Sequence, residues 1–295
     1  MRLTARPWLP RPALCKTRSA QAMETVQDSI ECRGSALDAS RTRVVLFDFD
    51  GTLSLIRSGW VDVMVPMMVE CLLQLKTGES EQELTDTVAD YVARLTGKQT
   101  IYQMIELAGQ IRRRGGQPLE PLEYKHMYLS KLSHKIKDRV GGLRNGACPP
   151  EEFLVPGARR LLEALRERGL KLYLASGTDQ PYLREEVKLL RVDSYFDGRI
   201  FGALDDYESF SKKMLIDKII SESDFAGEEF LAFGDGYVEI QNVKEVGGVA
   251  AGVATDEPLC TRVDEVKRQR LLDVGADWII PNFLAHEELM KTLFP

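Results

Sequence analysis

Two aspartates, Asp48 and Asp50, stand two positions apart at the end of an apolar segment and have the clearest potential for chemistry in this sequence. Like charges about 4 Å apart repel by roughly 4 kcal/mol at an effective dielectric constant near 20, so the pair requires a nearby cation or a shared proton. With that relief, one carboxylate can attack phosphorus while the other carries a proton to a leaving group. Gly51 allows the backbone to turn sharply after the pair. The spacing therefore predicts a nucleophile beside a general acid.

A hydroxyl and a basic residue follow two later segments. Ser176 closes the apolar run 170–175, where a hydroxyl and a free backbone N–H suit a phosphoryl oxygen, although an ordinary loop and helix cap would show the same residues. Lys212 and Lys213 begin a predicted helix, where lysine is disfavoured unless it faces an anion. We favour Lys212 as the residue that neutralises the phosphoryl charge, with Lys213 as the alternative.

A second pair of carboxylates, Asp235 and Glu239, lies one helical turn apart after the apolar run 229–233. Mg²⁺ in proteins is bound by one or two carboxylates together with waters and phosphate oxygens. The pair therefore predicts a Mg²⁺ site, with a simple capped helix start as the alternative.

Short β-branched and aromatic runs alternate with helical segments around these clusters. The predicted strands are residues 43–49, 170–175, 199–203, 229–233, 249–254 and 277–280, with helices at 156–168, 181–190 and 212–223. This alternation predicts an α/β fold, a Rossmann-like and mostly parallel sheet with helices on both faces. Ligands bind beyond the C-terminal ends of strands in such sheets, which is where the polar clusters stand.

A long helical segment interrupts this alternation after the first strand. Residues 57–149 contain four runs with apolar residues at three- and four-residue steps and no convincing strand, which predicts an inserted all-α cap. The α/β core then comprises residues 43–56 and 150–295. Candidates for substrate contact in the cap are Arg57, Thr100, Gln103 and the basic run 112–114; for that run a solvated helix end is the simpler interpretation.

Composition limits the function further. No run approaches the roughly 20 apolar residues of a membrane span, and a net charge of −6 gives no reason to expect nucleic acid. The five cysteines are scattered without a C-x-x-C pair, so neither a zinc site nor a disulfide framework is indicated.

The N-terminal extension differs from the rest of the chain. It contains five basic residues and three prolines before the first acidic residue, Glu24. This composition is typical of an organellar transit peptide; a disordered tail, or a true start at Met23, would also account for it. We leave residues 1–42 out of the fold, and expect a mitochondrial or chloroplast location if they are a transit peptide and a cytoplasmic one otherwise.

Taken in order, the four clusters resemble the haloacid-dehalogenase-like superfamily. Its most specific parts here are Asp-Phe-Asp-Gly-Thr at residues 48–52 and the Gly-Asp-Gly segment that leads to Glu239. The resemblance extends from about residue 43 to the C-terminus and implies a Rossmann-like core with a helical cap. Phosphoglycolate phosphatase-like and β-phosphoglucomutase-like members share this layout.

The resemblance also implies roles for single residues. Asp48 would form an aspartyl-phosphate, and Asp50 would protonate the leaving alkoxide and then activate water. Ser176 would hydrogen-bond the phosphoryl group and Lys212 would offset its charge. Positioning and charge neutralisation supply most of the catalysis in phosphoryl transfer.

The implied metal is Mg²⁺, held by Asp48, the backbone carbonyl of Asp50, Asp235 and Glu239. Many relatives have aspartate where this chain has Glu239, so that residue would bind directly or through water. Thr52, which follows the Asp48–Asp50 pair, and Gly177, which follows Ser176, are predicted to contact the substrate.

These expectations favour a phosphatase that acts on a small phosphorylated metabolite, such as a sugar phosphate or phosphoglycolate. A sugar phosphomutase would use the same residues but pass the phosphoryl group to a second hydroxyl. A non-catalytic phosphoacceptor or scaffold would also use a strand-end aspartate, but would have no need for Asp50 or a large cap.

Overall fold

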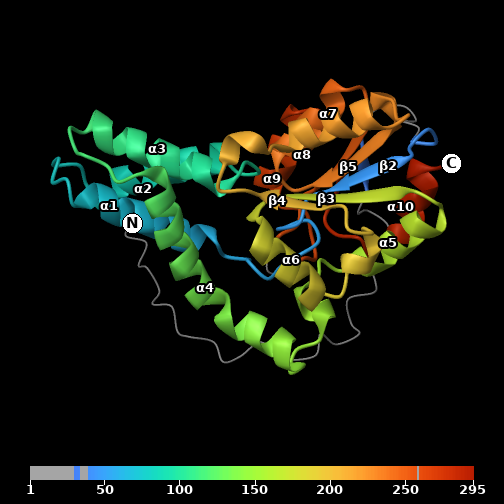
Figure 1. The fold of residues 1–295 in the computed structure, drawn as a ribbon, viewed down its shortest axis with the longest axis horizontal. Coiled ribbons are helices and arrows are strands. Elements are labelled where there is room, and N and C mark those ends of the chain that lie inside the picture. Colours follow the sequence, from blue (N-terminus) through green and yellow to red (C-terminus); the bar gives the residue numbers. More distant parts are fainter. Residues whose placement is uncertain (1–29, 34–38, 258) are drawn as a thin grey trace, which may run out of the picture.

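The computed structural model describes residues 30–33, 39–257 and 259–295. These segments form a seven-stranded sheet with helices on both faces and a helical extension at one end (Figure 1). The strands are β1 (Glu31–Cys32), β2 (Val44–Phe47), β3 (Lys171–Asp179), β4 (Ile200–Ala203), β5 (Phe230–Gly234), β6 (Val249–Val253) and β7 (Trp278–Ile280). Their order in the sheet is β1-β7-β6-β5-β2-β3-β4, and only the β1–β7 pair is antiparallel among them.

Strand β2 lies at the centre of the parallel part and is buried on both faces, as its apolar sequence predicts. Val44 pairs with Lys171 of β3 on one side and with Phe230 of β5 on the other. Because the three strands run in register, their C-terminal ends reach the same edge of the sheet. The polar residues that follow β2 and β5 are therefore brought together by backbone pairing.

In the described part of the chain, six α-helices cover the two faces of the sheet (Figure 1). Helices α7 (Lys212–Glu222), α8 (Tyr237–Glu245) and α9 (Glu265–Asp273) pack on one face, with Val44 and Leu46 of β2 in the same apolar cluster. Helices α5 (Ala158–Glu167), α6 (Gln180–Leu189) and α10 (His286–Leu293) pack on the other, with Val45 and Phe47. The alternation of β2 side chains between two cores is the period-2 pattern of a buried strand, and it confirms the predicted α/β class.

Of the α-helices that the structure describes between β2 and β3, all except α5 lie within the segment 57–149 predicted as a cap. They are α1 (Val61–Leu73), α2 (Glu81–Arg94), α3 (Thr100–Arg113) and α4 (Pro121–Asn145). Helix α4 runs from this bundle back to the core, where it lies beside α6 (Figure 1). None of the helices in the described part of the chain combines the length and apolar character needed to cross a membrane.

Two predictions about the elements need correction. The two-residue strand β1 pairs with β7, and Ala39 is buried, although we left residues 1–42 out of the fold. Strand β3 continues to Asp179 instead of ending at residue 175, because an irregularity in its pairing with β4 lets the strand extend through Ser176. The transit-peptide prediction concerns residues that lie mainly outside the described ones.

Candidate active site

Asp48 follows β2 directly and is fixed by the sheet, since its backbone N–H donates to the Phe233 carbonyl at 2.9 Å. The chain then turns through Gly51, which has φ +78°. A Cβ at this position would also clash with the carboxyl group of Asp235. Glycine is therefore required both for the turn and for the close approach of the loop that follows β5. The predicted role of Gly51 in a sharp turn is thus confirmed.

Lys212 joins two of the predicted acidic residues. Its Nζ donates to Asp48 Oδ1 at 2.6 Å and to Glu239 Oε2 at 2.7 Å, and its side chain is only 4% exposed. Burial alone would lower the pKa of Lys212, but the two carboxylates outweigh that effect and raise it, so the ammonium stays charged. Lys213, in contrast, is exposed and pairs with Glu245 at 2.6 Å. The geometry therefore places Lys212, and not Lys213, at the carboxylates.

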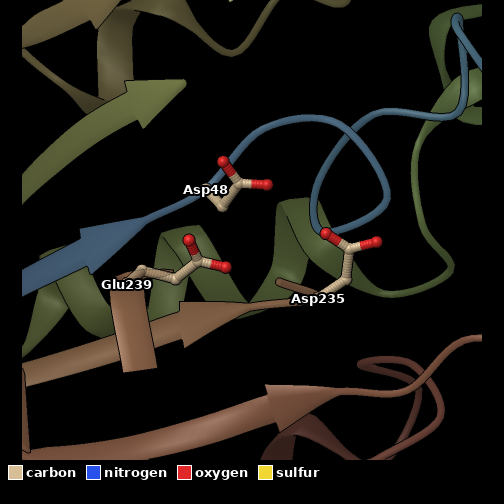
Figure 2. Close-up of side chains that lie close together, drawn as sticks. All are labelled: Asp48, Asp235 and Glu239. Carbon is tan, nitrogen blue, oxygen red and sulfur yellow. The ribbon is translucent and has the colours of Figure 1, made fainter. Parts of the chain in front are cut away.

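Asp48, Asp235 and Glu239 offer ligand oxygens that lie within 4.8 Å of one another. Figure 2 shows the three carboxyl groups around one small space at the C-terminal ends of β2 and β5. Glu239 is fully buried and is held by the Gly236 N–H, which donates to its Oε1 at 3.0 Å. Hard carboxylate oxygens in this number fit Mg²⁺, so the donor set agrees with the predicted metal.

Burial dominates the electrostatics of the aspartates in this group. It raises the pKa of Asp48 well above the usual range, although Lys212 opposes the shift. It also raises the pKa of Asp235 to about 6, opposed by Lys267. The negative charge of Glu239 adds to both shifts, and a bound cation would relieve that repulsion.

Asp235 has two further partners from different parts of the chain. Its backbone N–H donates to Thr52 Oγ1 at 3.0 Å, so Thr52 supports the loop of Asp235, whereas we predicted that it contacts substrate. Lys267 Nζ donates to Asp235 Oδ2 at 2.9 Å. We did not identify Lys267 from the sequence. It stands in the first turn of α9, so the criterion that singled out Lys212, a lysine at a helix start, would also have found it.

Asp50 lies among hydroxyl groups from β3. Thr178 Oγ1 donates to Asp50 Oδ2 at 2.7 Å, and Ser176 Oγ lies 3.4 Å from the same oxygen. The Thr178 N–H also donates to Ser176 Oγ at 3.0 Å. The structure thus brings Ser176 beside the predicted acid and adds Thr178, which sequence reasoning missed because it places residues 176–178 in a loop.

Arg57, in the linker between the core and the cap, approaches Asp50 from the other side. Its Nε lies 3.9 Å from Asp50 Oδ1. The guanidinium forms a buried ion pair with Glu186 of α6, with Nη2 donating to Oε1 at 2.8 Å. Arg57 therefore lies near Asp50, but its guanidinium is paired with a core carboxylate, and its contact with substrate stays a prediction.

The cap meets the core through the turn before α3. The Gln99 side chain donates to the carbonyls of Tyr207 and Phe210 at 3.2 and 2.5 Å. Next to it, the Lys98 carbonyl lies so close to Gly177 that a Cβ there would be 2.8 Å away. The backbone of the cap at Lys98 thus packs directly against Gly177, which we predict to contact substrate.

The remaining cap candidates lie elsewhere. Gln103 is buried within the helical bundle, where its Nε2 donates to the Leu95 carbonyl at 3.5 Å, so the prediction that it contacts substrate is not supported by this arrangement. Thr100 is the half-buried first residue of α3. Arg113 and Arg114, at the opposite end of α3, pair with Glu106 and Glu79.

The sequence model of the haloacid dehalogenase-like hydrolases matches residues 42–247, which is more than half of the chain. The chain therefore belongs to the haloacid dehalogenase-like hydrolases. A comparison with curated proteins found no match.

Solved structures share the fold at low identity. A predicted phosphoglycolate phosphatase from Haemophilus somnus is 14% identical, with 85% of this chain and 98% of that chain covered and a TM-score of 0.54. A haloacid dehalogenase-like family protein from Streptococcus pneumoniae is 17% identical, with 85% and 99% covered and a TM-score of 0.54. A hydrolase from Pseudomonas syringae is 19% identical, with 84% and 99% covered and a TM-score of 0.52.

Proposed function

We propose that this hydrolase is a Mg²⁺-dependent phosphatase that acts on a small phosphate monoester through an aspartyl-phosphate at Asp48. The observation that carries the proposal is the cluster at the ends of β2 and β5. There Lys212 bridges Asp48 and Glu239, and Asp235 completes a set of three carboxylates within 4.8 Å. Family membership supports the same chemistry.

In the first step, an Asp48 carboxylate oxygen attacks phosphorus, and the bond from phosphorus to the leaving oxygen breaks. Asp50 supplies the proton that the departing alkoxide needs. Thr178 fixes the Asp50 carboxyl group by a hydrogen bond of 2.7 Å, so the acid is oriented before substrate binds. Lys212 offsets the charge that gathers on Asp48 and the phosphoryl oxygens.

In the second step, Asp50, now a carboxylate, removes a proton from water. That water attacks phosphorus, the bond to Asp48 breaks, and inorganic phosphate and free Asp48 are restored. Asp48, Asp235, Glu239 and the carbonyl of Asp50 would hold the metal. When bound, Mg²⁺ neutralises charge on the nucleophile and the phosphoryl group.

We propose the substrate only as a class, a small phosphate monoester, and not as a single compound. The Haemophilus somnus protein of similar fold is described as a predicted phosphoglycolate phosphatase, and at 14% identity this justifies including phosphoglycolate in a test panel, not choosing it. Sugar phosphates belong in the panel because they are small phosphate monoesters, the substrate class proposed here.

The test is phosphate release from sugar phosphates, phosphoglycolate and nucleotides, with and without Mg²⁺, for the wild type and for Asp48→Asn and Asp50→Asn. We expect Mg²⁺-dependent release that falls by at least about 10⁴-fold in Asp48→Asn, because the nucleophile is lost. Release by Asp48→Asn at the wild-type rate would contradict the proposal. Isomerised sugar with little free phosphate would identify a phosphomutase instead.

A further inference from the structure

Lys267 connects the acidic cluster to the linker of the cap. Its Nζ donates to Asp235 Oδ2 and to Glu257 Oε1, both at 2.9 Å. Glu257 in turn accepts a hydrogen bond of 2.5 Å from the Ser58 hydroxyl through its other oxygen. These four residues come from four separate places in the chain: Ser58 from the linker after β2, Asp235 from the end of β5, Glu257 from the loop after β6, and Lys267 from α9.

The contacts of Asp235 leave its carboxyl group little freedom. Thr52 holds its backbone N–H, Gly51 packs directly against its carboxyl group, and Lys267 fixes Oδ2. Residues that hydrogen-bond a metal ligand orient it, and their loss commonly weakens metal binding about 10- to 100-fold. Lys267 contacts Asp235 in this way without belonging to the carboxylate set.

The partner of Lys267 is itself tied to the cap. Ser58 lies two residues before Trp60, the N-cap residue of α1. Its carbonyl accepts a hydrogen bond of 2.9 Å from Arg139 of α4. Arg139 also donates to the Ile56 carbonyl at 2.7 Å. Arg139 thus holds the linker from the cap side, and Glu257 holds it from the core side. A displacement of the linker would therefore shift Glu257 and, through it, Lys267.

We infer that Lys267 is a positioning residue for the cation site, and that Glu257 and Ser58 make its position depend on the linker of the cap. The inference rests on the proposed Mg²⁺ site. It adds a connection between that site and the linker that joins the cap to the core. Lys267 fixes one oxygen of Asp235, and the other remains available for the cation.

The experiment is a calorimetric titration of the purified protein with Mg²⁺, which needs no substrate. The variants are Lys267→Met, Glu257→Gln, Ser58→Ala and the double variant Ser58→Ala/Lys267→Met. Lys213→Met is the matched control, because Lys213 is an exposed helix-start lysine that pairs with Glu245. Thermal unfolding of each variant establishes that it is folded.

We expect the Kd for Mg²⁺ to rise about 10-fold or more in Lys267→Met and a few-fold in Ser58→Ala, with Lys213→Met unchanged. The double variant should bind no more weakly than Lys267→Met, because both changes interrupt one chain of contacts. If Lys267→Met does not fold, Glu257→Gln and Ser58→Ala carry the test.

Three outcomes would overturn the inference. Unchanged affinity in Lys267→Met would show that Asp235 needs no positioning, and tighter binding would show that Lys267 competes with the cation. Additive effects in the double variant would separate Ser58 from Lys267. A wild type that binds no Mg²⁺ would overturn the cation site and the proposed mechanism together, whereas the other results leave that mechanism intact.

Discussion

Charged groups at the edge of the sheet and charged groups between the cap and the core are both largely buried, but they are held differently. Asp48 and Asp235 follow strands that pair in register, so the sheet fixes where they meet. At the boundary, by contrast, Arg57 reaches Glu186, and Lys125 of α4 reaches Asp179 at 2.7 Å, across two bodies joined by a linker. Positions set by a sheet are more exact than positions set by side chains that span a boundary.

The difference suggests a division of labour. The sheet edge presents a preorganised set of charges, as phosphoryl transfer requires. The boundary pairs join the linker and α4 to α6 and β3, so they act on how the cap is held against the core. We therefore expect changes at the edge to affect the chemical step most, and changes at the boundary to affect stability and closure of the cap.

The largest effect that separates the two regions should come from Lys212. Lys212→Met leaves Asp48 and Glu239 buried without their shared cation. We expect kcat to fall about 10²- to 10³-fold at saturating Mg²⁺, which is the usual cost of losing one charge-stabilising group. The measurement is steady-state phosphate release with the best substrate of the panel.

Lys213→Met provides the control, since the exposed pair of Lys213 with Glu245 lies away from the carboxylates. Its kcat should stay within about two-fold of the wild type, because exposed ion pairs contribute little. Equal losses in the two variants would show that helix α7 as a whole, and not the Lys212 ammonium, supports catalysis.

The same contrast explains what the sequence could predict. Asp48, Asp235 and Lys212 were found because polar residues at strand ends and helix starts meet at one edge of a parallel sheet. Thr178 was missed because β3 continues past residue 175, and this depends on pairing with β4 that no local pattern records. Strand β1 has two residues, too few to show a period.

In the cap, helical spacing predicted four helices but not which residues would meet the core. Gln99 is the non-helical N-cap residue of α3 and touches the core loop, whereas Gln103, inside the helix, turns into the bundle. Which of these residues meets the core depends on how the cap packs against the core, and this is set by the whole linker and by α4. Sequence periodicity contains no information about it.

The next prediction tests the boundary itself through the buried pair of Arg57 and Glu186. Glu186→Gln removes the charge that faces the guanidinium, so we expect the free energy of unfolding to fall by about 3 kcal/mol. Arg57→Met/Glu186→Met removes both charges and should recover much of that loss, because a buried pair exchanged for apolar side chains is often neutral. Urea unfolding of the three proteins measures both values. A double variant no more stable than Glu186→Gln would mean that the pair is needed for packing and not only for charge balance.

The smallest effect should come from the pair of Arg114 and Glu79 at the C-terminal end of α3, opposite the end that meets the core. Arg114 donates to both Glu79 oxygens at 2.6 and 2.7 Å, and Thr77 donates to one of them at 2.7 Å. These hydrogen bonds, that of Arg114 first, lower the pKa of Glu79 from 4.5 to about 2. Because the folded-state pKa is the lower one, the stabilisation is complete above about pH 4.5 and is lost as the pH falls toward 2.

Arg114→Gln should therefore raise the pKa of Glu79 toward 4.5, as measured by NMR titration of its carboxyl carbon, while phosphate release stays at the wild-type rate. Arg113→Gln, which removes the neighbouring pair with Glu106, should leave the Glu79 titration unchanged. A loss of activity in Arg114→Gln would contradict the division drawn above, because it would mean that the outer end of the cap influences the sheet edge through α3. An unchanged Glu79 pKa would instead assign the shift to Thr77, and the pair with Arg114 would then have no measurable part in it.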